Sequence, residues 1–240
     1  MESAPKTLSY GQFVEMLDAG LGFRTTSYFA KNRHSVLSAL CDQYGSDKGE
    51  LRPDGHPYPW PSHNYADYYE MLFRHCRHSI TKVFECGLGT NNPILPSSMT
   101  EKGKPGASLR VWRDYFPNAQ IYGADIDRDI LFTEERIKTH YIDQREPKAI
   151  EAYWQQVGET DFDFMLDDGL HVFEAGSCLF THSIHHLAEN GIYVIEDVAP
   201  KDLLRYKDFF GKTAYVVDYV TMLRPKLPLG DNSLVVIRKG

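Results

Sequence analysis

The second half of the chain alternates short apolar runs with amphipathic ones, and this alternation limits the possible folds more than any other feature. Near-continuous apolar runs are typical of buried strands, and the segments between them show helical spacing. The predicted strands are residues 82–89, 120–127, 139–144, 162–169 and 191–198, followed by a terminal pair, 213–224 and 233–240. The predicted helices among them are residues 108–117, 149–157, 173–191 and 201–210. This order predicts an α/β domain with a doubly wound, mostly parallel, seven-stranded sheet.

The first part of the chain has a different pattern of apolar and polar residues. Residues 7–42 and 65–77 carry apolar side chains at helical spacing, and a polar stretch rich in glycine and proline separates them. We therefore predict two parts: a helical N-terminal extension, residues 1–78, with a loop that covers the ligand, and the α/β domain, residues 79–240.

The composition is that of a globular protein: 42% of the 240 residues are hydrophobic and 25% are charged. A net charge of −7 gives no general attraction to nucleic acid or to an anionic membrane. No apolar run approaches the ~20 residues that cross a bilayer, and the N-terminus lacks a signal-peptide core. The cysteines have no metal-binding spacing and are typical of thiols in a reducing compartment: Cys41, Cys76, Cys86 and Cys178. We expect a cytoplasmic protein with neither a nucleic-acid nor a membrane partner.

Each of the five predicted parallel strands ends in acidic residues. They are Glu85, Asp125 with Asp127, Asp143, Asp167 with Asp168, and Glu196 with Asp197. The carboxyl ends of parallel strands meet at one edge, where doubly wound domains bind ligands. Any one of these acids could cap a helix or form a turn. Together they repel one another unless a cation, or a ligand rich in hydroxyl and ammonium groups, binds among them.

The first strand leads into Gly87 and Gly89, which allow a close approach of the backbone to a cofactor. The full phosphate-binding G-x-G-x-x-G is missing, because residues 90–106 intervene before the next helix, and a dinucleotide domain is therefore not supported. Asp125 ends the second strand, where a carboxylate can accept hydrogen bonds from both ribose hydroxyls. A cofactor with a ribose but no pyrophosphate fits best, and S-adenosylmethionine is the common one.

Three of the strand-end acids could form a metal site. Asp168 and the pair Glu196 and Asp197 are one strand–helix–strand crossover apart, so they are predicted to end neighbouring strands. Their oxygens suit Mg²⁺, and a metal-bound hydroxyl loses its proton more readily. His171 follows Asp168 by three residues and is either a general base or a polar residue of the next helix. We predict Asp168 and His171 as catalytic residues, with Asp168, Glu196 and Asp197 as metal ligands.

Several of these segments resemble a known family. Residues 106–127 (GASLRVWRDYFPNAQIYGADID), 167–171 (DDGLH) and 193–198 (YVIEDV) are similar to the metal-dependent sugar O-methyltransferases of macrolide and other natural-product pathways. The segment YGSDK, residues 44–48, also looks like their N-terminal region, and the resemblance covers roughly residues 41–200. It implies a Rossmann-like class I methyltransferase fold, S-adenosylmethionine and Mg²⁺ as cofactors, a hydroxylated acceptor, and a homo-oligomer.

The resemblance also implies roles for individual residues. It repeats the metal ligands and base named above, and it implies a cofactor site formed by Glu85, Gly87, Gly89, Ser108, Asp125, Asp143, Gln144 and Asp167. In this assignment Asp143 and Gln144 flank the adenine, Asp167 faces the methionine ammonium, and Ser108 contacts the methionine carboxylate. Tyr44, Asp47 and Lys48 receive no individual roles.

The leading hypothesis is therefore a Mg²⁺-dependent O-methyltransferase that acts on a hydroxyl of a sugar or of a glycosylated natural product. The alternatives are a metal-independent N- or phenol O-methyltransferase and a catalytically silent subunit that binds a nucleoside. A dehydrogenase is disfavoured, because the Tyr-x-x-x-Lys at Tyr44–Lys48 precedes the glycines and contains a glycine itself. Two segments have open roles: residues 90–106 are a lid, an acceptor-recognition loop or a solvated excursion, and the aromatic residues 56–65 stack on a sugar or pack internally.

Overall fold

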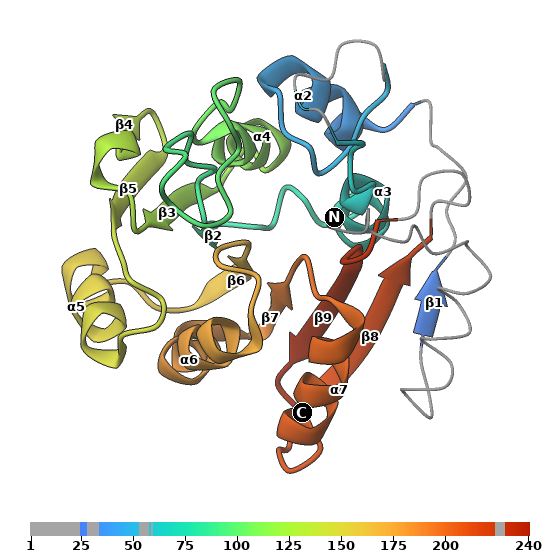
Figure 1. Ribbon diagram of the computed structural model, residues 1–240, viewed down its shortest axis with the longest axis vertical. Coiled ribbons are helices and arrows are strands. Elements are labelled where there is room, and N and C mark those ends of the chain that lie inside the picture. Colours follow the sequence, from blue (N-terminus) through green and yellow to red (C-terminus); the bar gives the residue numbers. More distant parts are fainter. Residues whose placement is uncertain (1–24, 28–33, 53–57, 59, 224–228) are drawn as a thin grey trace, which may run out of the picture.

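The computed structural model describes residues 25–27, 34–52, 58, 60–223 and 229–240. In this part of the chain one sheet holds nine strands in the order β1-β8-β9-β7-β6-β2-β3-β5-β4 (Figure 1). The strands are β1 Thr25–Ser27, β2 Lys82–Cys86, β3 Gln120–Asp125, β4 Thr133–Glu134, β5 Ile137–Tyr141, β6 Phe162–Asp167, β7 Leu187–Ile195, β8 Val216–Met222 and β9 Ser233–Arg238. The predicted seven-stranded, mostly parallel sheet is confirmed as the centre, and the short strands β1 and β4 extend its two edges.

The register brings the strand-end acids to one edge of the sheet. Strands β5, β3, β2, β6 and β7 are parallel, whereas β9 is antiparallel to both β7 and β8. Asp167 at the end of β6 pairs with Cys86 on β2 and with Ile195 on β7. The residues that follow each of these strands therefore begin at the same level, as the doubly wound arrangement requires.

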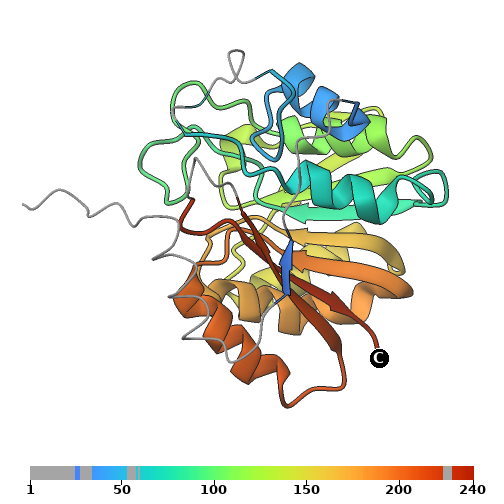
Figure 2. The same cartoon turned by 90° about the vertical axis from the view of Figure 1, so that its right-hand side faces the viewer.

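Six α-helices cover the two faces of the sheet in the described residues (Figures 1 and 2). One apolar cluster packs against α2 Val36–Tyr44, α3 Tyr65–Phe73 and α4 Ala107–Tyr115, and the other packs against α5 Pro147–Val157, α6 Phe173–Ser183 and α7 Pro200–Phe210. The near-continuous apolar runs of the central strands follow from burial on both faces. No helix among the described residues is long and apolar enough to cross a membrane.

Helix α3 connects the N-terminal part of the chain to the core through its aromatic face. The ring of Tyr69 meets Trp112 of α4 edge-on at 5.4 Å, and Phe73 packs against Phe164 of β6 at 5.0 Å. Residues four apart lie on one face of a helix, so Tyr65 and Tyr69 both point into this interface. Both rings are buried, which places their hydroxyls beneath the acidic edge of the sheet.

Two predicted helices differ from the structure. Most of the helix predicted over residues 7–42 lies outside the described residues, but Thr25–Ser27 within it forms β1, which pairs with β8. The helix predicted over 173–191 ends at Ser183, and after a short 3₁₀ turn β7 begins at Leu187. Strand pairing with β6 overrides the helical spacing there, and Gly191 is needed because a Cβ would lie 2.7 Å from the Phe162 carbonyl oxygen.

Candidate active site

A pocket of about 310 Å³ opens at the carboxyl ends of the parallel strands. This volume is at the lower end of the range for small-molecule sites. Nine of the predicted site residues line it: Gly87, Gly89, Ser108, Asp125, Asp143, Gln144, Asp168, His171 and Asp197. The other three, Glu85, Asp167 and Glu196, are buried beneath or beside it.

The glycine loop after β2 forms one wall of the pocket. Gly87 has a φ of 96°, and a Cβ there would lie 2.0 Å from the carbonyl oxygen of Asp168. Only glycine tolerates both this backbone conformation and this contact. Asp125 accepts hydrogen bonds from the backbone N–H of Leu88 at 2.7 Å and of Asp127 at 2.8 Å. These two bonds fix the carboxylate and leave half of its lone pairs for a ligand.

Gln144 connects the end of β5 to the turn after β6. Its side-chain oxygen accepts from the Leu170 N–H at 2.8 Å, and its amide donates to Asp167 at 3.1 Å. Asp167 also accepts from the Gly169 N–H at 3.3 Å, and burial raises the pKa of the Asp167 carboxyl to about 6. Its side chain does not line the pocket, so contact of Asp167 with a methionine ammonium stays a prediction. Asp143 does line the pocket, where it pairs with Arg145 at 2.8 Å.

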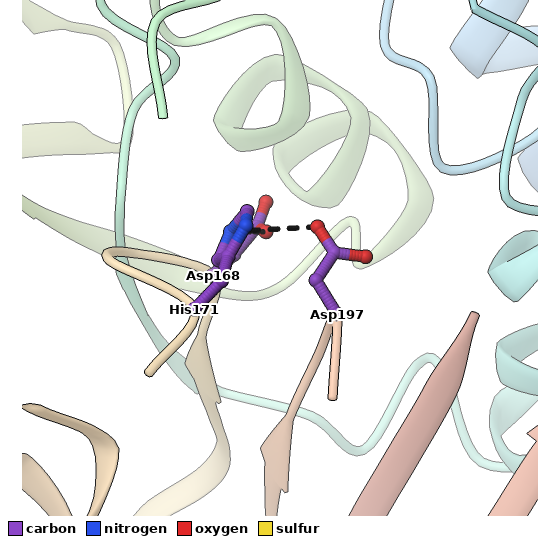
Figure 3. A group of neighbouring side chains, drawn as sticks. All are labelled: Asp168, His171 and Asp197. Atoms are coloured by element: carbon purple, nitrogen blue, oxygen red, sulfur yellow. Dashed lines mark hydrogen bonds and ion pairs between the residues drawn. The ribbon is translucent and has the colours of Figure 1, made fainter. Parts of the chain in front are cut away.

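Asp168, His171 and Asp197 face one another across the ends of β6 and β7 (Figure 3). His171 Nε2 lies 3.3 Å from Asp168 Oδ1 and 3.4 Å from Asp197 Oδ2. One donor atom from each residue lies within 4.8 Å of the others, and the two carboxylates supply the oxygen donors that Mg²⁺ prefers. This donor set fits a hard divalent cation.

The backbone at this group is unusual. His171 has a φ of 58° and Asp197 has a φ of 53°, in the left-handed region that non-glycine residues rarely adopt. Such conformations cost about 1–3 kcal/mol each and persist where the surrounding structure enforces them, often at functional sites. Here they turn both side chains toward Asp168.

Electrostatics at the group favour charged forms. Burial opposes the charge on His171, but the carboxylates of Asp197 and Asp168 raise its pKa to about 10. Burial also opposes the charge on Asp168, but the Lys48 ammonium and His171 lower its pKa to about 2. The imidazolium and the two carboxylates therefore stabilise one another in the protein as described.

Glu196 faces a different partner from Asp197. Its carboxylate is 1% exposed, pairs with the Lys48 ammonium, and accepts from the Tyr69 hydroxyl at 2.6 Å. Lys48 also pairs with Asp168, and its Nζ lies 3.5 Å from Glu85 Oε1. The metal-ligand role predicted for Glu196 stays a prediction, because in this arrangement its oxygens contact Lys48 and Tyr69.

Glu85 lies at the base of the site. Its side chain is fully buried and accepts from the Trp112 indole N–H at 2.7 Å. Burial, only partly offset by Lys48, raises the pKa of the Glu85 carboxyl to about 7. Glu85 does not line the pocket, so its predicted contact with the methionine end of a cofactor also stays a prediction.

Four residues of the site are not predicted from the sequence. Lys48 lies in the family-like segment 44–48 but has no role assigned by the resemblance, and His63, Tyr65 and Tyr69 match no motif. Tyr65 donates to Asp197 at 2.7 Å, and His63 Nδ1 lies 3.2 Å from the same carboxylate. The only available signal was the spacing of Tyr65 and Tyr69 on one helix face; nothing local indicated that this face meets the acids of β7.

The long loop 90–106 folds back over the pocket. The Met99 N–H donates to the Thr90 carbonyl at 2.7 Å, and the Gly106 N–H donates to the Leu88 carbonyl at 2.7 Å. Leu95, Pro96, Ser97 and Met99 line the pocket. Of the three possibilities for this loop, these contacts favour a lid or an acceptor-recognition loop, and its role stays a prediction. In the aromatic stretch, Tyr58 also lines the pocket and stacks on Trp60 at 5.0 Å.

Known proteins resemble this chain in both sequence and fold, although no family model matches it. It is 31% identical over 176 residues to demethylmacrocin O-methyltransferase of Streptomyces fradiae, covering 72% of this chain and 42% of that protein. It is 29% identical over 162 residues to 8-demethyl-8-alpha-L-rhamnosyl tetracenomycin-C 2'-O-methyltransferase of Streptomyces olivaceus, covering 68% of this chain and 37% of that one. The chain thus spans less than half the length of these relatives.

A solved structure shows the same fold. The MycE methyltransferase of the mycinamycin biosynthetic pathway, in complex with Mg, SAH and mycinamycin VI, superposes with a TM-score of 0.60 at 23% sequence identity. The match covers 85% of this chain and 54% of that chain. The predicted resemblance is confirmed: the chain is similar to sugar O-methyltransferases of antibiotic biosynthesis, and its fold is that of the class I S-adenosylmethionine-dependent methyltransferases.

Proposed function

We propose that this chain transfers a methyl group from S-adenosylmethionine to a hydroxyl of a sugar or glycosylated acceptor, with Mg²⁺ in the acidic site. One observation carries the proposal: a single pocket joins the glycine loop and Asp125 to the group Asp168, His171 and Asp197. The pocket can therefore hold a nucleoside-type cofactor beside a hydroxyl that must lose a proton. The sugar O-methyltransferase names of the relatives support the acceptor class.

The cofactor half of the pocket is assigned as follows. Gly87 and Gly89 allow close approach of the backbone, and Asp125 accepts from the ribose hydroxyls. The adenine lies between Asp143 and Gln144, and Ser108 binds the methionine carboxylate. Two buried acids position neighbours of this half: Asp167 accepts a hydrogen bond from the Gln144 amide, and Glu85 accepts one from the Trp112 indole N–H.

The acidic half holds the metal and the acceptor. Asp168 and Asp197 present oxygens to the pocket, with Glu196 behind them as the third predicted ligand. When bound there, Mg²⁺ lowers the pKa of an acceptor hydroxyl and orients it. Tyr65 and His63 keep Asp197 in place, and the loop 90–106 limits access of water to the pocket.

His171 is proposed as the residue that takes the proton of the acceptor hydroxyl. In the metal-free protein the carboxylates of Asp168 and Asp197 keep this ring protonated; a divalent cation held by the same carboxylates would lower the pKa of His171, and the neutral ring would then accept the acceptor's proton at Nε2. Proton transfer lets the oxygen attack the sulfonium methyl, and correct orientation supplies much of the rate because the donor is already activated.

A metal-independent methylation of nitrogen or of a phenol is the second candidate. The Lys48 ammonium favours it, because it already pairs with Asp168 and Glu196. Dependence on a divalent cation separates the two candidates.

The test combines binding and turnover. S-adenosylhomocysteine is titrated calorimetrically into the protein, and methyl transfer to a panel of glycosylated natural products is assayed with EDTA and after Mg²⁺ is restored. We expect cofactor binding with either treatment and turnover only with Mg²⁺. Full turnover in EDTA would remove the metal from the mechanism, and no binding of S-adenosylhomocysteine would end the methyltransferase proposal.

The proposal also includes a homo-oligomeric, cytoplasmic protein without nucleic-acid or membrane partners. The free thiols of Cys41, Cys76, Cys86 and Cys178 support a reducing compartment. Light scattering during gel filtration measures the oligomeric state, and a monomer at micromolar concentration would contradict this part.

A further inference from the structure

Three acidic side chains surround the ammonium of Lys48. The residue is 4% exposed, and its ammonium contacts carboxylates from three elements. These are Glu85 on β2, Asp168 after β6 and Glu196 after β7. Glu85 and Glu196 are 0% and 1% exposed, so bulk water does not reach them and Lys48 is the cation that they contact.

The position of Lys48 in the chain is equally informative. It is more than thirty residues before β2, in a segment whose backbone also holds helix α3: the Ala66 N–H donates to the Lys48 carbonyl at 2.8 Å. Neighbouring Asp47 lines the pocket and accepts from the Trp60 indole N–H at 2.8 Å. The ammonium is therefore brought to the strand ends by a segment fixed on both sides.

Lys48 and His171 share Asp168 between them. Asp168 Oδ2 faces the lysine and Asp168 Oδ1 faces the imidazole. A divalent cation bound by Asp168 and Asp197 would lie within a few ångströms of the ammonium, and like charges at this distance in a partly buried site repel strongly. The lysine thus stabilises the carboxylates and opposes a metal at the same place.

We infer that Lys48 is the internal counter-ion of the acidic site, a positioning residue that holds the three carboxylates together without a metal and competes with a divalent cation for them. The stability part of this inference depends only on the contacts of Lys48. The competition part rests on the proposed metal site.

The experiment compares Lys48→Met with Lys82→Met, which removes a lysine from the half-exposed surface pair with Glu159 at 2.8 Å. In EDTA, Lys48→Met leaves buried carboxylates unpaired and lowers Tm by roughly 6–20 °C, while Lys82→Met changes it by about 2 °C or less. Calorimetric titration with MgCl₂ is expected to show that Lys48→Met binds Mg²⁺ at least about tenfold more tightly than the wild type.

A double variant keeps the test decisive should Lys48→Met fail to fold. Lys48→Met/Glu196→Gln removes one charge of each sign and keeps the acceptor oxygen for Tyr69, so it regains at least half of the lost Tm. An unchanged Tm of Lys48→Met in EDTA, or no recovery of Tm in the double variant, would contradict the role of Lys48 as counter-ion. Unchanged or weaker Mg²⁺ binding by Lys48→Met would contradict the competition between Lys48 and a divalent cation. A wild type that binds no Mg²⁺ contradicts the proposed function, while the EDTA comparison still decides the counter-ion.

Discussion

The two halves of the pocket differ in how far along the chain the groups that hold their carboxylates lie. In the cofactor half, Asp125 is held by backbone N–H groups of Leu88 and Asp127, and Asp143 is held by the nearby side chain of Arg145. In the acidic half, Asp168, Glu196 and Asp197 are held by side chains of Lys48, His63, Tyr65 and Tyr69, which lie about 120 or more residues earlier in the chain. The first half is built locally by the βαβ unit, whereas the second is completed by the N-terminal part of the chain.

This difference predicts which half of the pocket a given substitution will affect. The backbone donors to Asp125 remain after a side chain is changed, so a substitution of Asp125 should affect only the contacts that its own carboxylate makes. Side-chain partners couple several residues, so the acidic half should lose activity and order together. Four substitutions test this expectation.

Asp168→Asn is expected to have the largest effect. It removes a carboxylate shared by His171 and Lys48, so methyl transfer should fall by about ten-thousand-fold or more. Affinity for S-adenosylhomocysteine, measured by calorimetry, should change by less than about threefold. The control is Asp163→Asn at the opposite end of β6, and an equal loss of cofactor affinity in Asp168→Asn would show that the halves are not separate.

His171→Gln is expected to lower kcat by about a hundredfold to ten-thousand-fold, the usual contribution of a general base. KM for both substrates should change little, because the side chain is proposed to move a proton rather than to bind. His182→Gln in helix α6, which follows His171 in the chain, is the matched control. A variant of His171 with near-wild-type kcat would exclude it as the base.

Glu85→Gln should change how stability depends on pH. The folded-state pKa of Glu85 is raised from 4.5 to about 7, so its contribution to stability is full below pH 4.5 and is lost as pH rises through 7. The wild type should therefore lose about 2–3 kcal/mol more unfolding free energy than Glu85→Gln between pH 5 and pH 8. Urea unfolding at both pH values measures this, with exposed Glu189→Gln as the control; parallel curves for Glu85→Gln and wild type would contradict the raised pKa.

Asp125→Asn is expected to have the smallest effect and to act only on the cofactor half. Loss of charge-assisted hydrogen bonds to a ribose should weaken S-adenosylhomocysteine binding by about ten- to a hundredfold. Mg²⁺ binding should stay within twofold, and Asp129→Asn, an exposed neighbour, should change neither. If Asp125→Asn weakened Mg²⁺ binding as much as cofactor binding, the division into two halves would be wrong.

The fold, and the residues that line the proposed cofactor half, could be predicted from the sequence because they depend on local patterns. Apolar runs of strand length, helical spacing between them, and Gly87 and Gly89 after the first strand all act over a few residues. The helix predicted over 173–191 failed where this locality failed, because pairing of β7 with β6 decided the conformation of Leu187 to Gly191.

The sequence by itself determined the alternation of strands and helices, the acids at the strand ends, the glycine loop and the DDGLH segment, because the places of strands along the chain follow from runs of buried residues. Only the tertiary structure decided which partner each of these acids contacts. It set Asp168 and Asp197 toward His171, Glu196 toward Lys48 and Tyr69, and Asp167 toward Gln144. The physical reason is that a buried carboxylate takes the partner that packing brings to it, and packing of α3 and the preceding segment against the sheet joins residues that no local pattern connects.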